Sequence, residues 1–251
     1  MSTNALYTDL SGYYDLMCAD IEYAEQSAYV HRLHGLLGNG GRNYLDLACG
    51  TGPHLRHFID FGYTASGVDI NQPMLDIAQQ RCPEAQFMQQ DMSQLKVDTQ
   101  LDLISCFLYS IHYNQSIAKL IDCIASVHAA LKPGGMFCFN AVDKSRIDNR
   151  MGIKRGLSHD GSEFSFQSNW YYSGTGERQE LQLSIEKISG DVVENWRDQH
   201  LMVALTFPHL QQLLAPYFEV HIFEHDYHKI APWDGSAGNA FFVAVKRDPN
   251  R

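Results

Sequence analysis

A short apolar segment that leads into a glycine-rich turn constrains this chain more than any other feature. Residues 44–52 read Tyr-Leu-Asp-Leu-Ala-Cys-Gly-Thr-Gly, and an amphipathic segment, 54–61, follows them. Asp69 ends a second strand-like run, 64–68, seventeen residues after Gly52. This order predicts a βαβ unit that binds a nucleoside, because small residues admit the ligand and the later carboxylate can accept hydrogen bonds from two ribose hydroxyls.

The residues of the turn argue against a dinucleotide as that ligand. The first small residue of the turn is Ala48, and the acidic Asp46 stands two positions before it. A carboxylate beside the turn would repel a pyrophosphate, whereas it would orient a ligand that carries an ammonium or sulfonium group. A glycine-rich turn without any ligand is the alternative that the turn alone leaves open.

Strand and helix patterns alternate in residues 41–143 and predict a parallel sheet with helices on both faces. Asn71 is a suitable N-cap for a helix that follows Asp69. Further strands are expected at 87–92, 101–107 and 136–140.

The pattern changes in residues 144–205, where alternating apolar residues predict an antiparallel β insertion. Its three expected strands are 164–172, 179–188 and 192–205, and the insertion is interpreted as either a substrate lid or an arm for a homodimer. Residues 206–251 would complete the core with one helix and a final hairpin, and residues 1–40 would form an N-terminal helical cap.

The order and spacing of these segments resemble the class I S-adenosylmethionine-dependent methyltransferases. The turn from Asp46 to Gly52 is similar to the first motif of that family, and Asp91-Met92 and the Leu-Lys-Pro-Gly-Gly turn at 131–135 stand where the family has later motifs. The resemblance implies a Rossmann-like, seven-stranded, mostly parallel sheet whose last strand is antiparallel. It also implies the cofactor S-adenosyl-L-methionine, with S-adenosyl-L-homocysteine as product.

The resemblance also implies roles for individual residues. Asp69 would hold the ribose, Asp91 and Met92 would face the adenine, and Asp46 would orient the amino group of the cofactor. The other residues expected to contact the cofactor are Tyr14, Tyr23, Ala48, Cys49, Gly50, Thr51, Gly52, Ile70, Met74, Cys106 and Phe107.

A closer resemblance, over about residues 10–143, is to small-molecule methyltransferases such as the nucleotide-sugar N,N-dimethyltransferases. It is carried by the Tyr-Asp-x-Met-x-x-Asp-x-x-Tyr pattern of residues 14–23 and by the turn that follows. It implies that Tyr14 closes over the cofactor or faces the transferred methyl group. A base is expected after the fourth strand, where Tyr109, Ser110, His112 and Tyr113 are candidates, and His112 is preferred for its intrinsic pKa.

The composition and charge of the sequence limit the kinds of molecule that the protein is expected to bind and the compartment in which it is expected. A net charge of −10 disfavours nucleic acid, and no apolar run approaches a membrane span of about 20 residues. The N-terminus lacks the pattern of a secretory signal and the six cysteines form no C-x-x-C pair, so a reduced, cytoplasmic protein is expected. No metal site is predicted.

The sequence therefore predicts an enzyme that methylates an N or O atom of a small-molecule acceptor. A cofactor-binding protein without transferase activity and an RNA methyltransferase are the alternatives.

Overall fold

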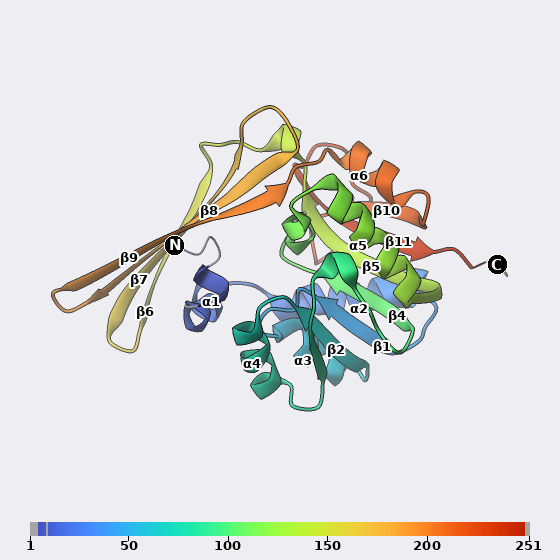
Figure 1. Ribbon diagram of the computed structural model, residues 1–251, viewed down its shortest axis with the longest axis horizontal. Helices are drawn as coiled ribbons and strands as arrows, with labels where there is room; N and C mark the ends of the chain where they lie inside the picture. Colours follow the sequence, from blue (N-terminus) through green and yellow to red (C-terminus); the bar gives the residue numbers. More distant parts are fainter. Residues whose placement is uncertain (1–4, 9, 249–251) are drawn as a thin grey trace.

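A seven-stranded sheet forms the centre of the molecule in this computed structural model, which describes residues 5–8 and 10–248 (Figure 1). The strands lie in the order β10-β11-β5-β4-β1-β2-β3, and only β11 runs antiparallel to its neighbours. Their bounds are β1 (Asn43–Leu47), β2 (Thr64–Asp69), β3 (Gln86–Gln89), β4 (Leu101–Cys106), β5 (Leu131–Val142), β10 (Phe218–Glu224) and β11 (Asn239–Lys246). The predicted mostly parallel sheet with one antiparallel strand is confirmed.

Helices cover both faces of this sheet, as the alternation of elements predicts. Tyr44 of β1 packs into one core cluster, whereas Leu45 and Leu47 pack into the other, on the opposite face. The first cluster lies under α2 (Tyr23–Leu37), α3 (Pro53–Asp60) and α4 (Gln72–Arg81). The second lies under α5 (Ile117–Ala130) and α6 (Phe207–Leu214).

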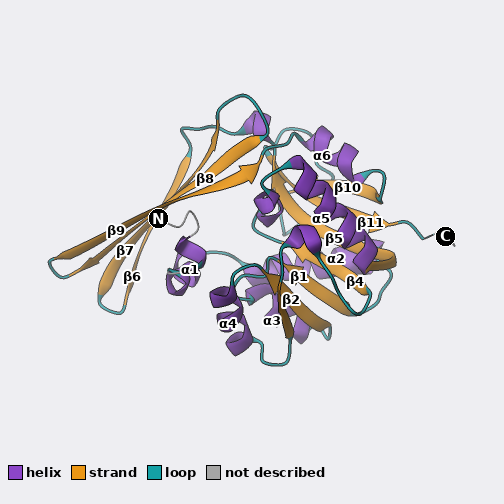
Figure 2. Ribbon diagram, viewed as in Figure 1, coloured by secondary structure: helices purple, strands orange, loops and turns teal. Residues whose placement is uncertain are grey.

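The insertion is a separate antiparallel sheet that extends away from the central sheet (Figure 2). It has four strands in the order β6-β7-β8-β9, namely β6 (Gly152–His159), β7 (Ser162–Tyr172), β8 (Arg178–Ser189) and β9 (Val192–Val203). The prediction of three strands was wrong, because it left out β6. This edge strand is mostly exposed and contains two glycines, so its sequence lacks the apolar alternation of a half-buried strand.

The N-terminal segment lies between the two sheets (Figure 1). It contains η1 (Ala5–Tyr7) and α1 (Ser11–Met17), and Leu6 packs into a small core with Phe164 and Phe166 of β7. Residues 1–4 and 9 of the predicted helical cap lie outside the described residues. The remaining short helices are η2 (Met92–Gln94), η3 (Ser110–Asn114) and η4 (Lys144–Arg146). Among the described residues, no helix is long and apolar enough to cross a membrane.

Candidate functional site

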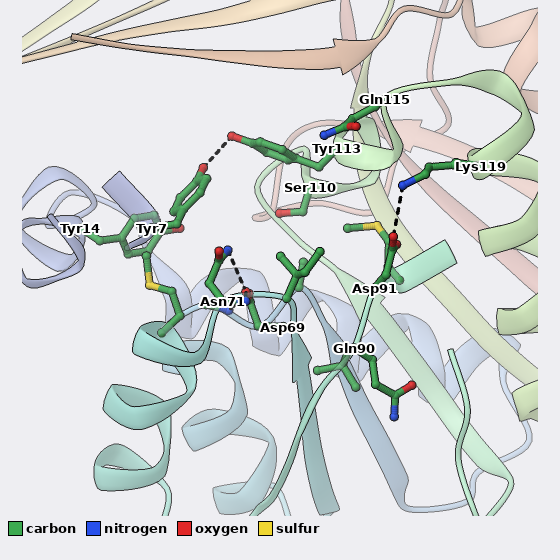
Figure 3. A pocket seen from close by; sticks show the side chains of 16 residues that line it. Tyr7, Tyr14, Asp69, Asn71, Gln90, Asp91, Ser110, Tyr113, Gln115 and Lys119 are labelled. Carbon is green, nitrogen blue, oxygen red and sulfur yellow. Dashed lines mark hydrogen bonds and ion pairs between the residues drawn. The ribbon is translucent and has the colours of Figure 1, made fainter. Parts of the chain in front are cut away.

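A cavity of about 870 Å³ lies where β1, β2 and β3 end (Figure 3). It is the position at which open parallel sheets bind ligands. Eight of the predicted cofactor residues line it: Tyr14, Ala48, Gly50, Asp69, Ile70, Met74, Asp91 and Met92. The other residues that line it are Tyr7, Val68, Asn71, Gln90, Ser110, Tyr113, Gln115 and Lys119. We call this the nucleoside cavity.

The glycine-rich turn forms the floor of the nucleoside cavity. The backbone φ angles of Ala48, Gly50 and Gly52 are 60°, 54° and 77°, in the left-handed region that glycine tolerates best. A Cβ atom on Gly50 would have only Tyr14 Cε1 nearby, at 3.8 Å, whereas one on Gly52 would lie 3.1 Å from Cβ of Ala78. Gly50 therefore keeps the cavity open, and Gly52 allows α3 to pack against α4.

The carboxylate of Asp69 is held in the nucleoside cavity by backbone groups. Its Oδ2 accepts a hydrogen bond from the Gly50 N–H at 2.9 Å, and its Oδ1 accepts from the Asn71 N–H at 2.9 Å. Burial raises the pKa of this carboxyl, and the two N–H groups oppose that rise. The N–H donors fix the direction of the carboxylate and leave lone pairs on both oxygens for further donors.

The carboxylate of Asp91 bounds the same cavity, where it caps η2. Its Oδ1 accepts from the Ser93 N–H at 2.9 Å, and its Oδ2 lies 3.2 Å from Lys119 Nζ. These contacts lower the pKa of Asp91 although partial burial acts in the opposite direction.

A small extension of about 280 Å³ lies beside the turn and contains an unpaired acidic oxygen. Asp46 is 1% exposed; its Oδ1 accepts from Ser105 Oγ at 3.0 Å, but its Oδ2 has no hydrogen-bond partner among the described residues. Burial raises the pKa of Asp46 to about 8, the Ser105 hydroxyl opposes the rise, and the charge of Asp69 adds to it. The predicted residues Tyr14, Tyr23, Ala48, Cys49 and Phe107 also line this extension.

Three of the predicted cofactor residues line none of these spaces. Cys106 is buried at the end of β4, and Gly52 faces α4. Thr51 instead ties the turn to α1, because its hydroxyl donates to Asp15 Oδ1 at 2.6 Å and Arg81 reaches both residues. This contact holds Tyr14, the residue before Asp15, over the turn.

A second large cavity, of about 900 Å³, lies between the insertion sheet and the central domain. Aromatic and aliphatic side chains dominate its lining, and Arg155, which pairs with Asp20 at 3.1 Å, is the one fully charged residue among those that line it. The apolar residues include Met17, Ile21, Leu108, Ile153, Phe166, Trp170, Leu181 and Leu183. We call this the acceptor cavity, after the methyl acceptor that the sequence predicts.

Three tyrosines connect the two large cavities. Tyr7, Tyr14 and Tyr113 line both of them and come from η1, α1 and η3. Figure 3 shows Tyr7 and Tyr113 hydrogen-bonded to each other, with 2.6 Å between their hydroxyl oxygens. Tyr14 thus lies at the junction of the two cavities, and its place beside the cofactor stays a prediction.

His112, the predicted base, does not line either large cavity. It is 1% exposed; its Nδ1 lies 2.8 Å from the Val203 carbonyl oxygen, and its Nε2 accepts from the Val142 N–H at 3.0 Å. Burial lowers the pKa of His112 to about 4. Since Val142 and Val203 stand at the two ends of the insertion, His112 fastens the insertion to the core, and this geometry does not support a role as base.

Sequence reasoning missed several residues of the site. Tyr7 and Trp170 line the cavities, and His200 and Asp198 stand directly behind Tyr113. The spacing of Asp198 and His200, two apart on one strand, places both on one face, but nothing in the sequence shows that this face meets η3. The described residues hold no group of three or more metal-ligating side chains, and all six cysteines are buried and unpaired.

Known methyltransferases are similar to this chain in sequence and in overall fold. Residues 45–135 match the family model of a methyltransferase domain. A Bacillus subtilis protein named as a methyltransferase, YqeM, is 30% identical over 146 residues, which cover 57% of this chain and 58% of that protein. The dTDP-3-amino-3,4,6-trideoxy-alpha-D-glucopyranose N,N-dimethyltransferase of Streptomyces venezuelae is 37% identical over 116 residues, 46% of this chain and 48% of that protein.

These alignments span about half the length of the curated relatives. Similarity over the whole fold comes from the crystal structure of DesVI from Streptomyces venezuelae, with a TM-score of 0.82 and 22% identity over 95% of this chain and 99% of that chain. Residues 45–135 are therefore similar to a methyltransferase domain, and the chain has the same overall fold as DesVI.

Proposed function

We propose that this protein transfers a methyl group from S-adenosylmethionine to an N or O atom of a small-molecule acceptor. The observation that carries the proposal is the meeting of the nucleoside cavity and the acceptor cavity at Tyr7, Tyr14 and Tyr113. Methyl transfer from a sulfonium is an in-line displacement, so donor and acceptor must meet end to end in a space that excludes water.

The residues of the nucleoside cavity fit the chemistry of this cofactor. The carboxylate of Asp69 would accept hydrogen bonds from the two ribose hydroxyls, and the buried, unpaired oxygen of Asp46 would receive the ammonium group. The open face of Gly50 would admit the methionine part. S-adenosylmethionine itself supplies an activated methyl group, so the protein needs to align the reactants and to take up a proton.

The acceptor cavity favours a compact acceptor with a largely apolar body. Its lining offers aromatic faces such as Trp170 and Phe166, and its one guanidinium, that of Arg155, is shared with Asp20. A multiply charged anion would therefore find little compensation there. The insertion acts as a lid in this proposal, because β6, β7 and β8 form one wall of the cavity.

An acceptor panel tests the proposed function. The full chain would be incubated with S-adenosylmethionine and, separately, with phenols, aliphatic amines, a dTDP-linked amino sugar and transfer RNA, and S-adenosylhomocysteine would be quantified. We expect turnover with at least one small molecule and none with transfer RNA. Tight cofactor binding without turnover of any acceptor would favour a binding protein instead, and turnover of the RNA alone would identify an RNA methyltransferase.

Cofactor affinity is expected to rise with pH on the acid side of neutrality. With a pKa of about 8, Asp46 is mostly protonated in the free protein at neutral pH, and pairing with an ammonium favours its ionised form. Binding should therefore release up to one proton, and affinity should increase up to about tenfold per pH unit until the amino group of the ligand, with a pKa of about 8, itself loses its proton.

Calorimetry in buffers of different ionisation enthalpy measures this proton release. The Asp46→Asn variant is the control, because it keeps the shape of the side chain and cannot lose a proton. Wild-type binding without proton release near neutral pH would contradict the assignment of Asp46 to the ammonium.

A further inference from the structure

A continuous chain of polar groups leads away from the point where the two large cavities meet. The Tyr7 hydroxyl lies 2.6 Å from the Tyr113 hydroxyl, as Figure 3 shows, and the Tyr113 hydroxyl lies 2.5 Å from His200 Nδ1. His200 Nε2 in turn lies 3.0 Å from Asp198 Oδ2. These groups come from η1, η3 and β9, so the fold brings together residues that are remote in the sequence.

The two polar groups farthest from the cavities, those of His200 and Asp198, are buried. The side chain of His200 is 0% exposed and that of Asp198 is 7% exposed, and Oδ2 of Asp198 also accepts from the Leu6 N–H at 3.2 Å. Burying the Asp198 carboxylate costs free energy because it removes a charge from water, and apolar side chains could pack these segments together without that cost. We therefore infer that the polar groups have a function other than packing.

The neighbours of His200 decide which of its nitrogens carries the proton. The carboxylate of Asp198 lies beside Nε2, off the line of an ideal hydrogen bond, and this negative charge favours a proton on Nε2. Nδ1 is then bare and accepts a hydrogen bond from the Tyr113 hydroxyl. Tyr113 thus donates to His200, and its oxygen is left to accept a proton from the side of the cavities.

We propose that Tyr113, backed by His200 and Asp198, takes up the proton that the methyl acceptor loses. This inference rests on the proposed function. A lone pair of the acceptor forms the new bond to the methyl carbon, and the broken S–C bond leaves its electrons on sulfur. The acceptor proton moves to the Tyr113 oxygen while the Tyr113 proton moves to His200 Nδ1. The positive charge lost by the sulfonium thereby appears on an imidazolium beside the Asp198 carboxylate.

The groups around His200 set the expected pH dependence. Tyr7 faces it from η1, Tyr113 from η3 and Asp198 from its own strand, whereas its cross-strand partner on β8, Leu181, brings no charge. Burial lowers the pKa of His200, and Asp198 opposes that shift. The imidazole is therefore neutral at pH 7 and able to accept a proton, and kcat should fall only in acid, below about pH 6.5, the usual pKa of histidine.

A His200→Asn variant tests the proposal with an acceptor from the panel. Asparagine keeps a hydrogen-bond acceptor near the position of Nδ1 but cannot take up a proton. We expect kcat to fall about 100-fold, the acid limb of the kcat profile to disappear, and KM for S-adenosylmethionine to stay within about twofold. Tyr113→Phe should lower kcat by a similar factor. Retention of kcat, or of the acid limb, in His200→Asn would overturn the proposal.

A second tyrosine–histidine pair in the chain provides matched controls. The Tyr63 hydroxyl lies 3.0 Å from His34 Nδ1, in a buried cluster that lines neither large cavity. His34→Asn and Tyr63→Phe therefore remove the same chemistry elsewhere and should leave kcat and its pH profile unchanged. A comparable loss of kcat in these variants would show that the effects at His200 and Tyr113 are general effects on the fold, and would also overturn the proposal.

A measurement without an acceptor separates this proposal from the proposed function. In ¹⁵N-histidine spectra of the full chain saturated with S-adenosylhomocysteine, His200 should show a bare Nδ1 and a protonated Nε2 at pH 7, and Tyr113→Phe should shift the Nδ1 resonance. His200→Asn identifies the signals. A protonated Nδ1 on His200 could not accept the proton of Tyr113, and this result would reject the proposed proton transfer. The absence of turnover across the acceptor panel would instead reject the proposed function.

Discussion

A Gly50→Val variant is expected to fold and yet to bind S-adenosylhomocysteine at least about 100-fold more weakly than the wild-type protein, a loss of about 2.7 kcal/mol. The reason is steric. A Cβ atom on Gly50 would project into the gap below Tyr14 Cε1, 3.8 Å away, so the valine side chain would fill the space proposed for the methionine part. Isothermal titration calorimetry measures the affinity, and the melting temperature reports on the fold.

Gly62→Val is the matched control for backbone strain. Gly62 has a φ of +81°, and a Cβ atom there would have no neighbour within 4 Å. Both substitutions should therefore cost about 1–2 kcal/mol of stability for a left-handed conformation, but only Gly50→Val should lose the ligand. Equal ligand affinity in the two variants would show that the space above Gly50 is not the cofactor site.

Asp69→Ala is expected to weaken cofactor binding by about 10- to 100-fold, or about 1–3 kcal/mol. The substitution removes the charged acceptor proposed for the ribose hydroxyls, and it also frees the Gly50 and Asn71 N–H groups that now hold the carboxylate. Titration of S-adenosylhomocysteine into the variant measures the loss.

Asp69→Asn separates these two effects. The amide keeps an acceptor for the Asn71 N–H and the size of the side chain, but it removes the charge, so we expect an intermediate affinity. Unchanged affinity in Asp69→Ala would contradict the assignment of this residue to the ribose.

The core of the fold was predictable because its signals are local. Strands β1 and β4 are short apolar runs that end in turns, and the glycine turn and Asp69 follow in the order that the sheet requires. The Leu-Lys-Pro-Gly-Gly segment at 131–135, expected as a turn before the fifth strand, forms the beginning of β5 instead. Strand β6 escaped prediction because an exposed edge strand needs little apolar surface. Its place is set by pairing with β7, which the sequence of β6 alone does not encode.

Eight of the residues that line the nucleoside cavity were predictable for the same reason, whereas the proposed proton acceptor was not. The intrinsic pKa favoured His112, but its environment depends on Val142 and Val203, which close around the ring only in the folded chain. Tyr113 and His200 are 87 positions apart, and their contact requires the insertion to fold back over η3. Such long-range contacts produce no motif with a fixed spacing, so the sequence alone does not indicate them.

The contacts among Asp15, Thr51 and Arg81 would have a kinetic consequence for the proposed reaction. They hold in place a segment that lines both large cavities, since Tyr14 borders the nucleoside cavity on one side and the acceptor cavity on the other. The Asp15–Arg81 pair is partly exposed, with side chains 41% and 30% accessible, so breaking it costs little. One opening motion of this segment would let both substrates bind and both products leave, so the rate of that motion would limit the rate of turnover.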